Sequence, residues 1–366
     1  MGHIMHTTTM YDALNTPGCP NEERGVLDPN IEEAQLEMLY KELAKTLLRL
    51  SKLEFPKIGS LSQVDDFAWE VTNRPLSMNI NELVRLGTLS RSKLPPLEAT
   101  FETASSYIEA LAQLNIQHLL HQRSDAVQSA DDCRRKFIAR QLFHKLAREK
   151  KLFQPCNEHG PFPLWCDDFR PANVLLNREL HITGVVDWEF TYAAPVEFSY
   201  APPWWLLIEK PEYWSEGIED WTRVFDHRLK TFLTAMRYCE DMDVQSGQSL
   251  SGRHRLSDHM QQSWESGDFW VVYAILHSFA FDAIYWQKID QRFFGPTETD
   301  NPSEAWKERL DLLDETQRSE MERLVTKKLE EMEDRALAWD PDGYTETSYQ
   351  ELRGRADKSK AEEARN

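Results

Sequence analysis

The chain has 366 residues, of which 41% are hydrophobic and 28% charged, so it is long enough to bury a substantial core. Its formal net charge is −19 at pH 7. This excess of acid argues against general binding to nucleic acid or to anionic membranes, since both need a cationic face. An acidic protein that binds a phosphorylated small molecule needs a few well-placed basic residues or metal ions.

The cysteines and the apolar segments indicate a cytoplasmic protein. The five cysteines are scattered without any CxxC pair, so we expect neither a zinc site nor a disulfide framework, but a reducing compartment. No secretory signal pattern is seen at the start. The most apolar stretch, residues 269–286, is as long as a membrane span, but His277, Ser278 and Asp282 interrupt it. We therefore predict a buried helix and no stable membrane insertion.

Apolar residues at helical spacing predict the long helices. The first is expected within residues 27–53, with Asp28 as its N-cap and Pro29 at its first helical position. Residues 56–96 are rich in turn-forming residues. Further helices are predicted at 105–123, 129–150, 218–240, 264–292 and 303–338.

Two strand-like runs, residues 173–177 and 181–188, are joined by a short connection and predict a β-hairpin. The expected fold is therefore mainly α with a small β-hairpin. We expect a flexible N-terminus over residues 1–27, a single helical catalytic domain over 28–340, and a polar, disordered tail over 341–366.

The hairpin carries three residues with hard oxygen ligands. Asp168 and Asn173 lie in "WCDDFRPANVLL", on the loop that enters the first strand, and Asp187 ends the second strand in "DWEF". A hairpin brings Asn173 and Asp187 side by side, which suits Mg²⁺. The alternative is that each residue only caps a turn.

Residues 166–207 resemble the catalytic region of fungal aminoglycoside-phosphotransferase-like proteins. In that family the catalytic loop reads roughly His-Gly-Asp-x-x-x-x-Asn, and the metal-binding strand ends in Asp-Trp-Glu. The likeness extends over about residues 35–210 and implies a kinase-like C-terminal lobe, with Asp168 as the catalytic Asp. Two positions depart from the pattern, because Cys166 replaces the His and Asp167 replaces the Gly.

The N-terminal lobe of a kinase is not evident. A kinase covers ATP with a Gly-rich loop and binds its phosphates with a strand lysine. Residues 1–30 contain three glycines but no GxGxxG motif and no lysine. We therefore expect the nucleotide lobe to be absent, which would deprive ATP-dependent transfer of its phosphate positioning.

The predicted helix over 264–292 has a mixed face. Counting back from Lys288 at helical spacing gives Ile284, Phe281 and His277, with Tyr285 on the same side. A cation beside an apolar, aromatic wall fits an amphiphile with an anionic head. The alternative is that Lys288 extends from a buried helix end into water.

The phosphotransferase-like chain without its nucleotide lobe, together with the aromatic helix ending in "IYWQKID", resembles the unconventional humulene synthases of fungal tropolone-sesquiterpenoid pathways. This resemblance implies a lyase of secondary metabolism that cyclises farnesyl diphosphate to a humulene-type hydrocarbon. It also implies two Mg²⁺ ions as cofactor and a lysine that binds diphosphate, here Lys288. The chain has no DDxxD, NSE-type or DxDD motif of ordinary terpene cyclases.

The resemblances define an expected site. Lys288 and Asp168 are the expected catalytic residues, and Arg170 joins Lys288 at the diphosphate. The other expected residues line the hydrocarbon pocket (His277, Phe281, Ile284, Tyr285) or bind metal (Asp168, Asn173, Asp187, with Asp167 and Glu189 in addition). No residue is assigned as the final base, a role that the released diphosphate can fill. Two other functions stay open: a small-molecule phosphotransferase, and a pseudokinase-like binding protein without chemistry.

Overall fold

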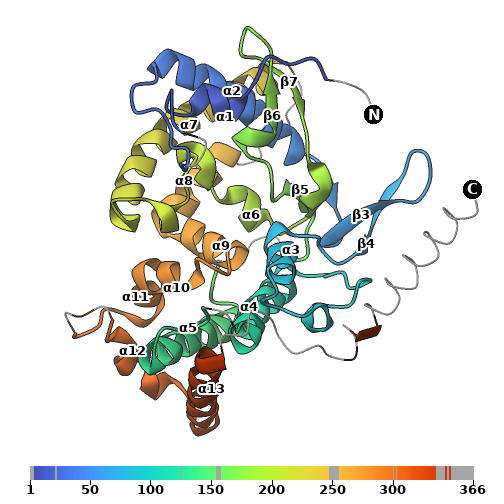
Figure 1. The fold of residues 1–366 in the computed structure, drawn as a ribbon. Helices are drawn as coiled ribbons and strands as arrows, with labels where there is room; N and C mark the ends of the chain where they lie inside the picture. Colours follow the sequence, from blue (N-terminus) through green and yellow to red (C-terminus); the bar gives the residue numbers. More distant parts are fainter. Residues whose placement is uncertain are drawn as a thin grey trace, which may run out of the picture.

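The computed structural model describes residues 4–20, 23–123, 125–153, 158–246, 255–299, 301, 303–334, 343 and 346–347. Helices form most of this part of the chain, and the strands form two small antiparallel sheets (Figure 1). The mainly α fold expected from the sequence is therefore confirmed. The four cysteines in the described residues are free, as expected, and Cys156 lies outside them. Most of the tail predicted to be disordered also lies outside them.

The N-terminal segment packs against the core where it is described, so the expected flexible N-terminus over 1–27 is wrong for these residues. Strand β1 (Thr8–Thr9) pairs with β6, and helix α1 (Met10–Leu14) follows it. Thr9 caps this helix in a reciprocal pair with Asp12. The helix is short, but Met10 and Leu14 are fully buried, which anchors the segment.

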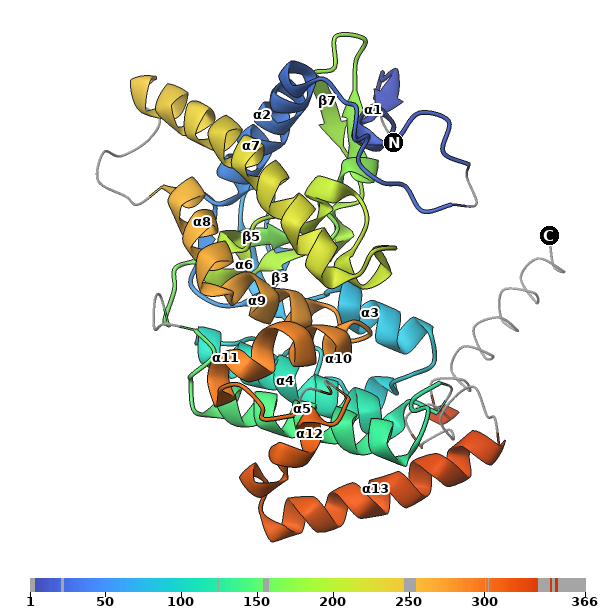
Figure 2. The same cartoon turned by 90° about the vertical axis from the view of Figure 1, so that its left-hand side faces the viewer.

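Two long helices pack along each other at one end of the molecule. These are α2 (Glu33–Leu50) and α7 (Ile218–Gln245), which lie side by side in Figure 2. The apolar stripe predicted from helical spacing is the buried face of α2. Asp28 does not cap this helix, because its Oδ1 instead accepts a hydrogen bond from the backbone N–H of Asn30, at 2.9 Å, in a turn before the helix begins.

The larger sheet contains strands that the sequence did not predict. Its order is β2-β5-β8-β3-β4, where the strands are Glu54–Phe55, Phe162–Cys166, Thr191–Ala193, Gly59–Gln63 and Trp69–Asn73. Residues 56–96 thus hold β3, β4 and helix α3 (Met78–Arg85) rather than turns alone. At Gly59 a Cβ would lie 2.4 Å from the backbone oxygen of Asn73, so this close strand approach requires glycine.

The smaller sheet confirms the predicted hairpin. Strands β6 (Val174–Leu176) and β7 (Ile182–Val185) pair antiparallel, and β1 completes the order β1-β6-β7. The register places Val174, the first residue of β6, opposite Val185, the last residue of β7, so Asn173 before β6 comes close to the residues that follow β7.

A second group of helices forms the other end of the molecule. Helices α4 (Ala104–His121) and α5 (Ala130–Arg148) pack against each other, and α13 (Glu315–Asp334) lies across α5 (Figures 1 and 2). The predicted helix over 303–338 is interrupted, with α12 (Ala305–Glu308) and a 3₁₀ turn before α13.

The predicted helix over 264–292 is broken. It consists of α8 (Leu256–Ser266), α9 (Asp268–Leu276), α10 (Phe281–Ile284), a π-helical turn (Tyr285–Ile289) and α11 (Asp290–Phe294). The chain leaves helical geometry at His277.

Asn79 of α3 stabilises this break. Its Nδ2 lies 3.0 Å from Oγ of Ser278, and its Oδ1 accepts a hydrogen bond from the Ser278 backbone N–H at 3.1 Å. A break in a buried helix frees polar backbone groups, and these contacts satisfy them in part.

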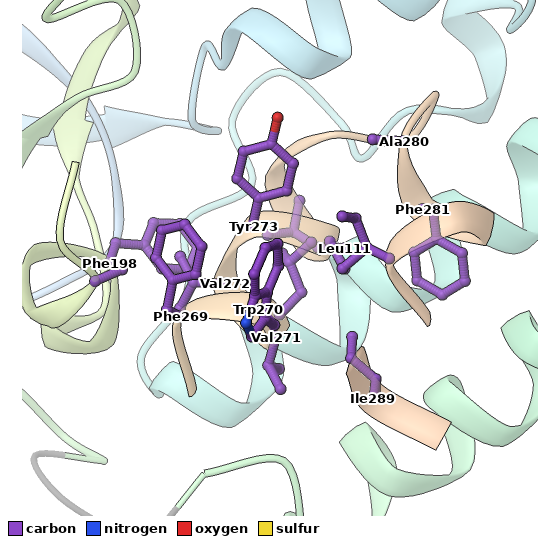
Figure 3. Close-up of a cluster of buried hydrophobic side chains, with 14 of the residues drawn as sticks. Leu111, Phe198, Phe269, Trp270, Val271, Val272, Tyr273, Ala280, Phe281 and Ile289 are labelled. Atoms are coloured by element: carbon purple, nitrogen blue, oxygen red, sulfur yellow. The ribbon is translucent and has the colours of Figure 1, made fainter. Parts of the chain in front are cut away.

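Helix α9 lies inside the protein. Its residues 269–275 are all buried, and Figure 3 shows the side chains of residues 269–273 between Phe198 of helix α6 (Val196–Tyr200) and Leu111 of α4. The prediction of a buried segment is confirmed here. Among the described helices, none combines the length and apolar character needed to cross a membrane.

Candidate functional site

A pocket lies between the loop after β5, the segment that follows α6, and the helices α8 and α9. Its polar residues include Asp168, Arg170, Lys210 and His277. The remaining wall is largely aromatic and aliphatic, with Trp204, Trp205, Met260, Phe269, Val272 and Leu276. Charged groups beside an apolar wall are typical of a site for a small amphiphilic molecule.

Asp168 is fixed at the polar part of this pocket. Its side chain is almost completely buried, with the residue 7% exposed. Asn173 Nδ2 donates to both Oδ2 and the backbone oxygen of Asp168, each at 2.9 Å. Arg170 Nε lies 2.7 Å from Oδ1, as an ion pair without hydrogen-bond alignment. Among the described residues no hydrogen-bond donor reaches Oδ1, and the Arg170 guanidinium balances its charge.

Asp167 has a different environment. Oδ1 accepts hydrogen bonds from Trp165 Nε1 at 2.6 Å and from the Tyr192 hydroxyl at 3.1 Å, and Oδ2 accepts one from the Met78 backbone N–H at 3.0 Å. Burial raises the pKa of this carboxyl to about 6, although these hydrogen bonds oppose the rise. Because protein donors engage both oxygens, the environment favours a structural role over the expected metal-binding one.

Asp187 lies beside the catalytic loop. The backbone N–H of Val186 donates to the backbone oxygen of Asn173 at 2.9 Å, and Asp187 is the next residue in the chain. It is exposed and has a left-handed backbone (φ 61°), a conformation that Asp tolerates better than most residues. Glu189 is exposed nearby.

The donors Asp168, Asn173 and Asp187 fit Mg²⁺ in chemistry, because all offer hard oxygens and Oδ1 of Asp168 has no hydrogen-bond donor. No group of three or more His, Cys, Asp or Glu suited to a metal occurs in the described part of the chain. The amide oxygen of Asn173 would therefore be part of such a site.

Lys288 does not line this pocket. Its Nζ lies 2.7 Å from Oε1 of Glu219, an exposed side chain at the start of α7, and 5.2 Å from the ring centre of Trp270. This arrangement agrees with the alternative in which the lysine extends from a buried helix toward water.

The other residues of the expected helix face are separated from the pocket as well. Phe281, Ile284 and Tyr285 are fully buried and do not line it. Phe281 packs edge-on against Phe143, and the Tyr285 hydroxyl donates to Asp290 at 3.3 Å. The break after α9 and the π-helical turn change the helical phase, so only His277 of the expected face reaches the pocket.

Lys210, rather than Lys288, is the lysine that lines this pocket. It lines the pocket with its Nζ 5.5 Å from the ring centre of Trp204. No Asp or Glu forms an ion pair with Lys210 within the described residues. The sequence contained one indication of this lysine, because Lys210 follows Trp204 by six residues in the aromatic segment "APPWWLLIEKPEYW".

The sequence pattern of the Phosphotransferase enzyme family matches residues 16–212, more than half of the chain and all of the catalytic loop. This chain belongs to that family. Neither the curated proteins nor the solved structures contain a significant match. The region of this phosphotransferase-family member that matches the family pattern ends at residue 212, two residues after Lys210. The second wall of the pocket, from α8, α9 and His277, therefore lies outside the matched region.

Proposed function

We propose that the pocket is the active site of a Mg²⁺-dependent enzyme acting on a small, largely apolar molecule that carries phosphate. The observation that supports this proposal is that Asp168, Arg170 and Lys210 share one pocket with an aromatic and aliphatic wall. The two cations would bind the anionic group, and the wall would bind the hydrocarbon and exclude water.

The reaction that this composition favours is cyclisation of a prenyl diphosphate, with farnesyl diphosphate giving a humulene-type hydrocarbon. Bound Mg²⁺, held by Asp168, Asn173 and Asp187, would neutralise charge on the leaving diphosphate. Arg170 and Lys210 would add contacts that strengthen as the carbon–oxygen bond breaks. Aromatic side chains such as Trp204 and Phe269 would surround the carbocation, whose charge is attracted to their faces.

Phosphate transfer to a small molecule is the second candidate, and family membership favours it more directly than cyclisation. Asp168 occupies the position of the catalytic Asp and lines the pocket where an acceptor hydroxyl would bind. Its Oδ1, paired with Arg170 in the structure, would exchange this contact for the hydroxyl proton of the acceptor. The apolar wall and the unpaired Lys210 make an apolar, anionic acceptor the better fit.

One pair of incubations separates these functions. The protein is supplied with Mg²⁺ and farnesyl diphosphate, and released diphosphate and extracted hydrocarbons are measured. In parallel it is supplied with Mg²⁺ and ATP, and ATP hydrolysis and the melting temperature are measured.

Cyclisation predicts a sesquiterpene hydrocarbon, loss of that product in Asp168→Asn, and no response to ATP. An ATP-induced rise in melting temperature without hydrocarbon would favour phosphotransfer. If the folded protein bound neither ligand, and Mg²⁺ left its melting temperature unchanged, both enzymatic proposals would be rejected in favour of a binding protein without chemistry.

A further inference from the structure

His277 occupies an unusual position in the pocket, because it is the residue at which α9 ends. Its Nδ1 lies 2.9 Å from the backbone oxygen of Tyr273. A carbonyl oxygen only accepts hydrogen bonds, so Nδ1 must carry the hydrogen. The neutral ring then has its lone pair on Nε2.

Aromatic contacts fix the plane of this ring. It stacks on Tyr273 with ring centres 4.0 Å apart and planes at 15°, and it meets Trp204 edge-on at 6.2 Å. The residue is partly exposed and lines the pocket. Nε2 has no hydrogen-bond partner among the described residues, so this nitrogen is the free polar atom that His277 offers to a bound molecule.

The surroundings keep His277 neutral. Burial and, secondarily, the nearby cation of Lys210 lower the pKa of His277 to about 3, against the opposing effect of the Tyr273 hydrogen bond. A neutral imidazole of low basicity still accepts a proton from a carbocation, which is a far stronger acid. An anion bound at Lys210 would weaken the repulsion that Lys210 exerts on an imidazolium, so the ring would become more basic once diphosphate is present.

We propose that Nε2 of His277 accepts the proton that ends the cyclisation, an inference that rests on the proposed cyclase function. The carbon–oxygen bond of the substrate breaks and its electron pair leaves with diphosphate. The electron pair of the distal double bond then forms the ring-closing carbon–carbon bond and leaves a cation. A carbon–hydrogen bond beside this cation supplies the electrons of the new double bond, and its proton moves to Nε2. The proton then passes to the departing diphosphate, which restores the neutral ring.

Other proton acceptors of the pocket are less suited to this step. Asp168 is paired with Arg170, and protein donors engage both oxygens of Asp167. Glu82 also lines the pocket, and its carboxylate is the main competitor to His277. Glu82→Gln is therefore the matched control.

The test compares wild type, His277→Asn and Glu82→Gln on farnesyl diphosphate with Mg²⁺. The Asn side chain keeps an N–H donor for the Tyr273 oxygen but has no basic nitrogen. We expect His277→Asn to retain diphosphate release within about tenfold, while hydrocarbon yield falls by about 10²-fold and terpene alcohols from water capture appear. Glu82→Gln should keep the wild-type product.

An unchanged hydrocarbon profile in His277→Asn would overturn the assignment and favour diphosphate as the base. Loss of the hydrocarbon in Glu82→Gln instead would assign the role to Glu82. Failure of wild type to release diphosphate is a separate result, because it rejects the cyclase function itself and the inference with it.

A second measurement does not depend on turnover or on the folding of a variant. In ¹⁵N NMR spectra of wild type at pH 7, His277 should show a protonated Nδ1 and an unprotonated Nε2. Addition of inorganic diphosphate with Mg²⁺ should raise the pKa of the ring. Protonation of Nε2 in the neutral ring, or no response to diphosphate, would contradict the proposal.

Discussion

His118 makes stability depend on pH in a way that can be measured directly. It lies on α4, is 2% exposed, and packs edge-on against Phe279 with ring centres 4.9 Å apart. Neither ring nitrogen has a hydrogen-bond partner among the described residues. Burial, followed by the cations of Arg140, Lys136 and Lys328, lowers its pKa from 6.5 to about 3.

The sign of the effect follows from proton uptake. Between pH 6.5 and 3 the unfolded chain protonates this histidine and the folded chain does not, so stability falls as the pH decreases below 6.5. A pH of 5 lies 1.5 units below the ordinary histidine pKa of 6.5. At this pH the free energy of unfolding is lower by about 2 kcal/mol, at 1.36 kcal/mol per pH unit. His277 adds a loss of similar size, whereas Asp167, with its raised pKa, offsets about 1 kcal/mol.

The perturbation is His118→Leu, studied by urea denaturation at pH 7 and pH 5. Leucine removes the titrating ring together with two unpartnered buried nitrogens, so stability at pH 7 should be retained or raised. The loss between pH 7 and pH 5 should be about 2 kcal/mol smaller than in wild type. Substitution of the exposed His227 by Leu is the control and should leave the wild-type loss unchanged. Equal losses in wild type and His118→Leu would refute this account of the buried histidine.

Three further predictions concern the site and the core. Lys210→Met should lower kcat/KM for farnesyl diphosphate by about 10²- to 10³-fold, whereas Lys288→Met should change it by less than about threefold; steady-state kinetics of both variants decide which lysine binds the substrate. Asp187→Asn should abolish turnover at saturating Mg²⁺ with an unchanged melting temperature, since the side chain is exposed and Asn, like Asp, tolerates the left-handed backbone; near-normal activity would make the hairpin purely structural. Arg309→Met should lower the free energy of unfolding by about 3–5 kcal/mol, measured in urea, because it leaves the buried carboxylate of Asp290 unpaired; a loss below about 1 kcal/mol would contradict this role.

The sequence predicted elements that local periodicity specifies. The hairpin over 173–188 and the helices α2, α4, α5 and α7 were expected at nearly their observed positions, because each has its own apolar pattern and end signals. Strands β3 and β4 were missed. They are short and largely polar, and their sheet is completed by β8, more than 100 residues later in the chain.

The site was predicted only in part, for a related reason. Asp168, Asn173, Asp187 and Arg170 lie on one local motif, and the structure keeps them in or beside the catalytic loop. The prediction that Lys288 binds the substrate beside His277 assumed one continuous helix between these two residues. The contact between Asn79 and Ser278, which joins segments almost 200 residues apart, accompanies the break that invalidates that count.

Under the proposed function, the two parts of the pocket wall have different roles, one in the reaction and one in the choice of substrate. The catalytic loop lies within the matched family region, whereas α8, α9 and His277 lie beyond it. A relative that retained this loop but carried different helices would therefore share the carboxylate of Asp168 while enclosing a molecule of another shape. Grouping such proteins by their best-matching segment would join enzymes with unrelated products. Under the proposed function, the residues that would distinguish their substrates lie between positions 256 and 277, outside the matched family region.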